Sequence, residues 1–171
     1  MATLTQMVTS GFAVAKALGL GDSTYQINRM YIEFENVATP ATAVSVPTFS
    51  ATAGLAYYQG LVSPKDYLSV PLLGQSTLSI ATGYESYFTA GVDGNQLTFL
   101  AQSAGSAGVN GVPFSNALNS KVYGIALVSA PDSSDATKDI LIARGYYAVA
   151  DQMIAPASGQ VHVNAQIVFA P

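Results

Sequence analysis

The chain has 171 residues, of which 50% are hydrophobic and only 9% are charged. Its length is that of one domain, and the hydrophobic content excludes an intrinsically disordered chain. A net charge of −4 argues against a nucleic-acid binder that neutralises phosphates with a basic face. The lack of cysteine excludes disulfide frameworks, thiolate metal sites and cysteine nucleophiles. An ordinary soluble domain carries about 25% charged residues, so the shortage of charge requires an explanation.

The N-terminal residues carry the best helix pattern in the chain. Apolar residues recur at spacings of three and four over residues 3–20, and Gly21 follows as a stop signal. The sequence therefore predicts a helical segment or arm over residues 1–24, ahead of a β domain over residues 25–171. Packing of this segment on its own domain and docking on a neighbouring subunit are both open at this point.

No targeting signal stands out in the sequence. The first residues lack the basic region and unbroken apolar core of a secretory signal. No window approaches ~18 consecutive apolar residues, which a transmembrane helix requires. We therefore expect synthesis and folding in a cytoplasm, without insertion into a membrane.

After the helical segment, the sequence patterns become those of β-strands. Residues 30–35 alternate between apolar side chains and two glutamates, which predicts a strand with Glu33 and Glu35 on its polar face. Residues 37–54 contain two prolines, which cannot donate to a central ladder. This stretch is therefore predicted to be an edge strand or a long crossing loop.

Short strands and turn signals continue to the end of the chain. An Asp-Gly pair at 93–94 predicts a hairpin, and three glycines predict a flexible loop over 102–113. In the last strand, Val161 and Val163 face one way and His162 faces the other. With seven or eight strands and one N-terminal helix, the sequence predicts a mainly β protein, an antiparallel β-sandwich or jelly-roll-like domain. The further strands are expected over residues 66–73, 76–82, 85–90, 95–102, 121–130, 138–150 and 160–170.

The titratable side chains offer no convergent catalytic set. His162 is the only histidine, and a solvated strand residue or an interface contact is the favoured interpretation. Glu33 and Glu35 are expected about 7 Å apart by strand geometry, a separation compatible with a glycosidase pair. Such pairs usually come from different elements across a cleft, so a solvated face or a contact with a partner's arginine explains them better. We predict no catalytic residues and a protein that is not an enzyme.

Three aspartates lie close together on one predicted loop. Asp132, Asp135 and Asp139 have oxygen ligands suited to Ca²⁺. The spacing is not that of an EF-hand, Lys138 lies among them, and loops of Asp, Ser and Pro are common turns. We predict no metal site, although ion binding by these three residues stays open. The Gly-Leu-Gly at 19–21 lacks the third glycine and the preceding strand of a dinucleotide fingerprint, so no cofactor is predicted.

Tyrosine and small polar residues dominate the remaining composition. The chain has ten tyrosines and seven phenylalanines but no tryptophan. Core packing is the favoured role of these aromatic residues, followed by subunit contact and then by contact with a glycan. A neutral polar exterior suits permanent contact with other subunits, because unpaired buried charges cost several kcal/mol each. Symmetric homo-oligomers are the usual route to such contact.

Two sequence blocks and the general texture carry a family resemblance. Residues 28–37 (NRMYIEFENV), residues 83–88 (GYESYF) and the cysteine-free, Ala/Thr/Ser/Gly-rich composition resemble the small virion structural proteins of tailed bacteriophages. The resemblance is greatest to capsid decoration (cement or head auxiliary) proteins.

This resemblance implies a β-rich protein, often a homotrimer, on the outer surface of the virion shell. There it would bind the major capsid protein and reinforce capsomer junctions against the pressure of packaged DNA, after synthesis in the host cytoplasm. It also implies no catalytic residues and no direct contact with nucleic acid.

Two alternatives remain. One is a tail or head-fibre component that contacts the host surface through the tyrosine-rich blocks and the loop at 102–113. The other is a sugar-binding or hydrolytic β-sandwich, which requires His162 or the pair of Glu33 and Glu35 at the base of a concave pocket.

Overall fold

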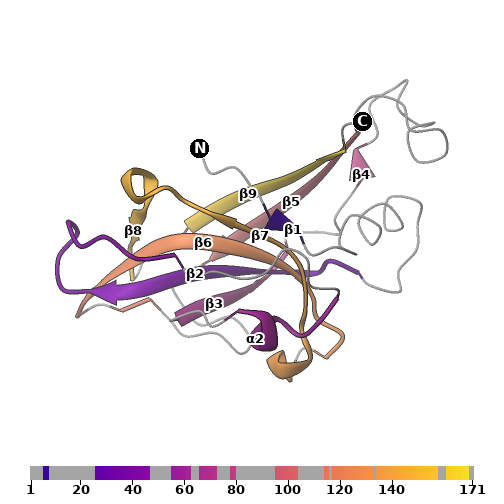
Figure 1. Ribbon diagram of the computed structural model, residues 1–171, viewed down its shortest axis with the longest axis horizontal. Coiled ribbons are helices and arrows are strands. Elements are labelled where there is room, and N and C mark those ends of the chain that lie inside the picture. The colour runs from indigo at the N-terminus through magenta and orange to yellow at the C-terminus, as the bar shows by residue number, and fades with distance from the viewer. Residues whose placement is uncertain are drawn as a thin grey trace.

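The computed structural model describes residues 6–7, 26–46, 55–62, 66–72, 78–79, 95–103, 114–115, 117–132, 134–157 and 161–169. Over these residues the protein is mainly β, with antiparallel sheets and one short α-helix (Figure 1). No helix in this part of the chain is long and apolar enough to cross a membrane. The strands are β1 (Gln6–Met7), β2 (Arg29–Val37), β3 (Asp66–Pro71), β4 (Leu78–Ser79), β5 (Asn95–Ser103), β6 (Asn119–Ser129), β7 (Ile140–Tyr146), β8 (Met153–Ala155) and β9 (Val161–Phe169). The α-helix is α2 (Tyr58–Leu61), and two 3₁₀ turns are η1 (Ala136–Lys138) and η2 (Val149–Asp151).

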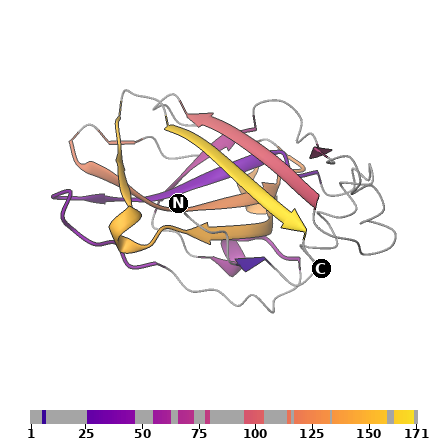
Figure 2. The same ribbon diagram turned by 90° about the horizontal axis from the view of Figure 1, so that it is seen from above.

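The strands form two sheets in which every pairing is antiparallel. The larger sheet has the order β1-β7-β6-β2-β3, and β8 pairs with the beginning of β6. The smaller sheet has the order β4-β5-β9. Figure 1 shows β5 and β9 on one side of the larger sheet, and Figure 2 shows them crossing over it.

The alternation of β2 divides the larger sheet into two faces. Met30, Ile32 and Phe34 are fully buried on what we call the inner face, where they share one apolar core with Val161 and Val163 of β9. Each such side chain contributes about 1.5–3 kcal/mol through its burial. The alternation predicted for these residues of β2 and β9 is confirmed. The opposite, outer face carries the odd-numbered residues of β2.

The central strand β6 is buried along almost its whole length. Its ladder with β2 shifts by one residue after Glu33, which leaves Tyr123 as the extra residue of a β-bulge. Because of this shift, Val122 and Ile125 belong to the same inner core although they are three positions apart. Tyr123 instead packs with Val44.

The prediction of an N-terminal helix is wrong at Gln6 and Met7. These residues form β1, which pairs with Arg144 and Ala143 of β7. The edge of the sheet offers backbone partners there, and such tertiary contacts override local helix periodicity. The rest of the predicted helical segment, with the boundary after residue 24, lies outside the described residues.

The other predicted elements agree with the structure only in part. The strand predicted over 138–150 is too long, because η1 precedes β7 and the chain turns through η2 into β8. A hydrogen bond from Asp151 N to Ala148 O closes that turn. The crossing loop is confirmed for residues 38–46, which carry no strand after β2. The strand at 85–90, the hairpin at 93–94 and most of the loop at 102–113 lie outside the described residues, and β4 is the described part of the strand predicted over 76–82.

Candidate functional site

A buried ion pair occupies the outer face of the larger sheet. Glu33 of β2 and Arg144 of β7 are both completely buried. The Arg144 Nε donates to both carboxylate oxygens of Glu33 at 2.9 Å, and its Nη2 donates to Oε2. A solvated face is therefore wrong for Glu33, and the arginine expected from a partner belongs to the same chain.

Glycine makes room for this ion pair in the intervening strand. Gly124 of β6 lies between Glu33 and Tyr146 in the sheet. A Cβ on Gly124 would lie 2.9 Å from the carbonyl oxygen of Gly145 and 3.0 Å from Glu33 Oε2. Any side chain at this position would thus have to displace backbone or the buried carboxylate.

Two tyrosines complete the environment of the ion pair. The Tyr58 hydroxyl, from α2, donates to Glu33 Oε1 at 2.5 Å, while Arg144 Nη1 donates to the hydroxyl of Tyr146. The guanidinium also lies 4.4 Å from the centre of the Tyr146 ring, within reach of a cation–π interaction. Burial by itself lowers the pKa of Arg144, but the hydrogen bonds and charge of Glu33 raise that pKa above its ordinary value. The arginine therefore stays charged, and its charge is matched by Glu33.

A second buried carboxylate lies beside the first. Asp139, between η1 and β7, accepts a hydrogen bond from the hydroxyl of Tyr31 on β2. The ring of Tyr31 contacts that of Tyr58 edge to face at 4.7 Å and stacks on that of Tyr67 at 4.5 Å. A cluster of three tyrosine rings thus joins the two carboxylates, and each carboxylate receives a tyrosine hydroxyl.

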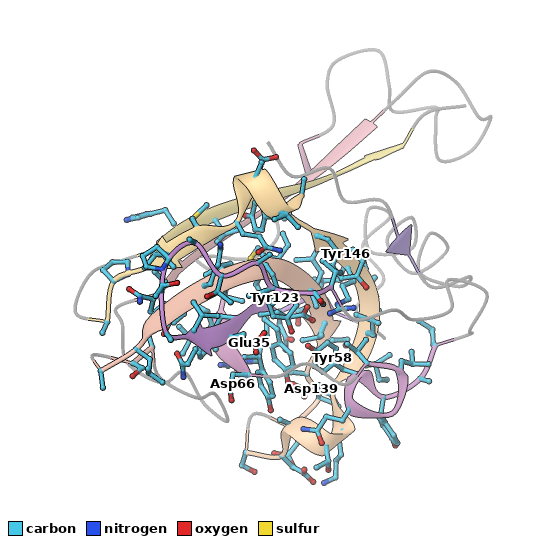
Figure 3. All side chains as sticks on the ribbon, turned by 60° about the vertical axis from the view of Figure 1, so that its left-hand side comes forward. Glu35, Tyr58, Asp66, Tyr123, Asp139 and Tyr146 are labelled. Carbon is cyan, nitrogen blue, oxygen red and sulfur yellow. The ribbon has the colours of Figure 1, made fainter. Side chains whose placement is uncertain are left out.

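The part of the outer face away from α2 is covered by the loop that follows β2. The ammonium group of Lys121 donates to the carbonyl oxygens of Pro40 and Thr42, each at 2.8 Å. The Gln152 side chain accepts from Val44 N at 3.2 Å and donates to Val44 O at 2.9 Å. Figure 3 shows Tyr58 and Asp139 next to α2, with Glu35 and Tyr123 farther along the sheet.

The three aspartates of the predicted loop do not converge on one point. Asp132 and Asp135 flank Lys138, whose ammonium lies 3.3 Å and 3.1 Å from their Oδ2 atoms. Hydrogen bonds from Ser134, followed by that from Lys138, lower the pKa of Asp132 to about 2. Asp139 is buried and binds Tyr31 instead. Among the described residues, no group of three acidic or histidine side chains is placed to hold a metal ion.

The candidate enzymatic residues lie on different sides of the protein. His162 is exposed on the face of β9 that points away from the shared core, whereas Glu33 is buried on the outer face of the larger sheet. Glu35 lies partly buried on the same outer face. Both carboxylate oxygens of Glu33 are hydrogen-bonded to groups of the same chain. Glu33 therefore has a structural role, in which it joins β2 to β7 and α2.

Sequence reasoning missed the main partners of the two carboxylates. Arg144 lies in the apolar strand Ile-Leu-Ile-Ala-Arg-Gly-Tyr, where a lone arginine signals a buried counter-charge. A scan against protein-family models and searches of curated proteins and of solved structures give no significant match. The function is therefore inferred from the residues of the chain itself.

Proposed function

We propose that the chain is a non-enzymatic virion structural protein, a capsid decoration (cement) protein. In this proposal it binds the outer surface of the major capsid protein shell, as a homotrimer, and stabilises the head. The observation that carries the proposal is that, in the part of the chain that the structure describes, five charged side chains are buried: Arg29, Glu33, Lys121, Asp139 and Arg144. The described surface then carries few charges, which suits wide contact with other protein.

The basic residues illustrate this use of charge most clearly. Of the four described, Arg29, Lys121 and Arg144 are buried, and each binds groups of its own chain. The fourth, Lys138, is exposed and lies between Asp132 and Asp135. A described surface with so little free positive charge supports contact with protein rather than with nucleic acid.

Exposed apolar side chains gather at one end of the larger sheet. Leu118 directly precedes β6, β8 pairs with the first residues of β6, and η2 leads into β8. We call this region the β8 end. Exposed apolar side chains on such neighbouring segments favour a protein contact. Its exposed residues are Leu118 (47%), Val149 (56%), Met153 (44%) and Ile154 (37%).

A β-sandwich or jelly-roll-like architecture is part of the proposal. The support is that Val161, Val163 and Ala165 of the smaller sheet share a core with the inner face of the larger one. Among the described tyrosines, Tyr31, Tyr58 and Tyr123 are fully buried and serve packing rather than contact with a glycan.

The proposal is tested by co-expression with the major capsid protein of the same genome. We expect the tagged chain to sediment with the assembled shells and to raise their thermal stability. A double variant, Met153→Asp with Ile154→Asp, should weaken this binding tenfold or more, equivalent to about 1.4 kcal/mol.

The matched control is Tyr57→Asp. Tyr57 is also exposed (56%), but it pairs with Ile140 near the opposite end of β6. We expect this variant to bind like the unmodified chain. A chain that remains monomeric and never sediments with shells would contradict the proposal.

A further inference from the structure

Asp139 joins elements that are far apart in the sequence. Its carbonyl oxygen accepts from Tyr58 N of α2 at 2.7 Å, and its own N donates to Ala136 O of η1 at 3.2 Å. Its side chain reaches β2 through the hydroxyl of Tyr31. Next to it, Leu141 N donates to Ala56 O at 3.1 Å, which extends the contact between β7 and the α2 segment. Asp139 therefore links α2, η1 and β2 at this corner of the protein, and its side chain supplies the link to β2.

The carboxyl group of Asp139 is buried and only partly satisfied. The residue is 2% exposed, and its Oδ1 is buried with no hydrogen-bond partner in the structure. The nearby guanidinium of Arg29 is engaged by Ser69, with Nε donating to Oγ at 2.7 Å and Nη2 donating to the carbonyl oxygen at 3.1 Å. A charged carboxylate in such a place carries an uncompensated desolvation cost.

The groups packed around Asp139 do not remove this cost. From β2 come Arg29 and Tyr31, of which the first attracts the carboxylate and the second donates to it. The loop before it adds repulsion from Asp132 and Asp135. The remaining titratable groups at this corner are Lys138 of η1, which lies between those two aspartates, and Tyr58 and Tyr67, whose rings pack on Tyr31.

We propose that Asp139 is a protonation-dependent latch, which fastens α2 and the loop at 132–139 to the sheet when its carboxyl takes up a proton and loosens them when it loses that proton. The protonated carboxyl carries no charge, so its burial costs less than that of the carboxylate. Local opening exposes the group to water, where the charged form is favoured. The proton therefore binds the closed corner more tightly than the open one.

The direction of the pH dependence follows from this difference. Burial, reinforced by Asp135 and Asp132, raises the pKa of Asp139 above its ordinary value of 3.8 despite Tyr31 and Arg29. The closed corner then holds more protons than the open one at pH values between 3.8 and the raised pKa. The latch is thus tightest below this window and loosens as the pH rises through it.

Backbone hydrogen exchange of the intact chain at several pH values tests the latch. After correction for intrinsic exchange, the opening constants of the Tyr58 and Leu141 amides should fall as the pH is lowered from neutral. The total fall should be about tenfold for each unit by which the closed-state pKa exceeds the open-state pKa. The amide of Val44, which is held by Gln152 elsewhere on the sheet, should not follow this change.

The variant Asp139→Asn is a permanent mimic of the protonated form. At neutral pH its corner should open less often than that of the unmodified chain, and the pH dependence should disappear. Asp151→Asn, at an exposed aspartate of η2 far from this corner, should keep the pH dependence and serves as the matched control.

Three outcomes would overturn the latch. These are an opening constant at Tyr58 that does not change with pH, a change shared equally by Val44, and an unaltered pH dependence in Asp139→Asn. If that variant does not fold, the carboxyl carbon of Asp139 in the unmodified chain can be titrated by NMR. Its midpoint must then coincide with that of the opening constants, and a midpoint at or below 3.8 would also overturn the latch.

Discussion

The two faces of the larger sheet are both buried, but by different chemistry. The inner face is covered by apolar side chains, with Ile32 and Leu68 among those that are completely buried. The outer face buries Glu33, Arg144 and tyrosine rings beneath α2 and the loop at 38–46. Packing on the first face depends on volume, whereas packing on the second depends on matched charges and hydrogen-bond directions.

This difference determines how each face should respond to substitution. An apolar core tolerates side chains of similar volume. A buried ion pair contributes little relative to an apolar replacement of both partners, yet the loss of one partner leaves a buried charge unpaired. The two faces are therefore distinguished by the kind of change that each tolerates.

The largest effect is expected from Arg144→Met on the outer face. This change leaves the carboxylate of Glu33 buried without its counter-charge, which should cost about 3–5 kcal/mol of unfolding free energy. Equilibrium urea denaturation measures this loss. The double variant Glu33→Met with Arg144→Met should lose less than the single variant, because no charge remains unpaired. Additive losses would contradict the pairing.

The inner face should show the opposite tolerance. Leu68→Ala leaves a cavity and should cost about 2–5 kcal/mol, whereas Leu68→Met nearly conserves volume and should cost less than about 1.5 kcal/mol. Urea denaturation again provides the measurement. If Leu68→Met were as damaging as Leu68→Ala, packing on the inner face would need the same directional matching as on the outer face.

A smaller effect is expected where glycine separates the buried groups. Gly124→Ala places a Cβ against the carbonyl oxygen of Gly145 and the carboxylate of Glu33. Overpacking of this kind costs about 1–3 kcal/mol. In the Glu33→Met, Arg144→Met background one of the two close contacts has changed, so thermal denaturation should give a different cost there. Equal costs in both backgrounds would attribute the whole effect to the backbone contact.

The smallest effect is expected at the exposed aspartates. Lys138→Met removes a hydrogen bond and a positive charge from Asp132, so the pKa of Asp132 should rise from about 2 towards its ordinary 3.8. Because this pKa is lowered by folding, the associated stability is present above 3.8 and is lost as the pH falls through about 2. NMR titration of the carboxyl carbon measures the change, and 1 M salt should mask part of it. An unchanged pKa would contradict the role of Lys138.

The sequence predicted the inner face better than the outer one. The period-two pattern of Met30, Ile32 and Phe34 was enough to place them in a core. The same pattern placed Glu33 in solvent, because alternation reports the direction of a side chain and not what covers it. The cover comes from Arg144, more than a hundred residues away, and from Tyr58 of α2. Pairing at such separations is set by sheet order, which local periodicity does not contain.

Local sequence patterns also failed to predict the structure where contacts with neighbouring strands determine it. Gln6 and Met7 lie within the predicted helical segment but pair with the edge of β7. The aspartate cluster was recognised in the sequence, but the inward turn of Asp139 towards Tyr31 depends on the position of η1 against β2.

The most direct test of the account is hydrogen exchange of the chain, free in solution and bound to capsid shells. We predict that binding protects the β8 end, around Leu118 and residues 149–154, while the already closed outer face at residues 31–35 exchanges equally slowly in both states. New protection centred on α2 and η1 instead of the β8 end, or no new protection at all, would contradict the proposal that the exposed apolar side chains of the β8 end bind the shell.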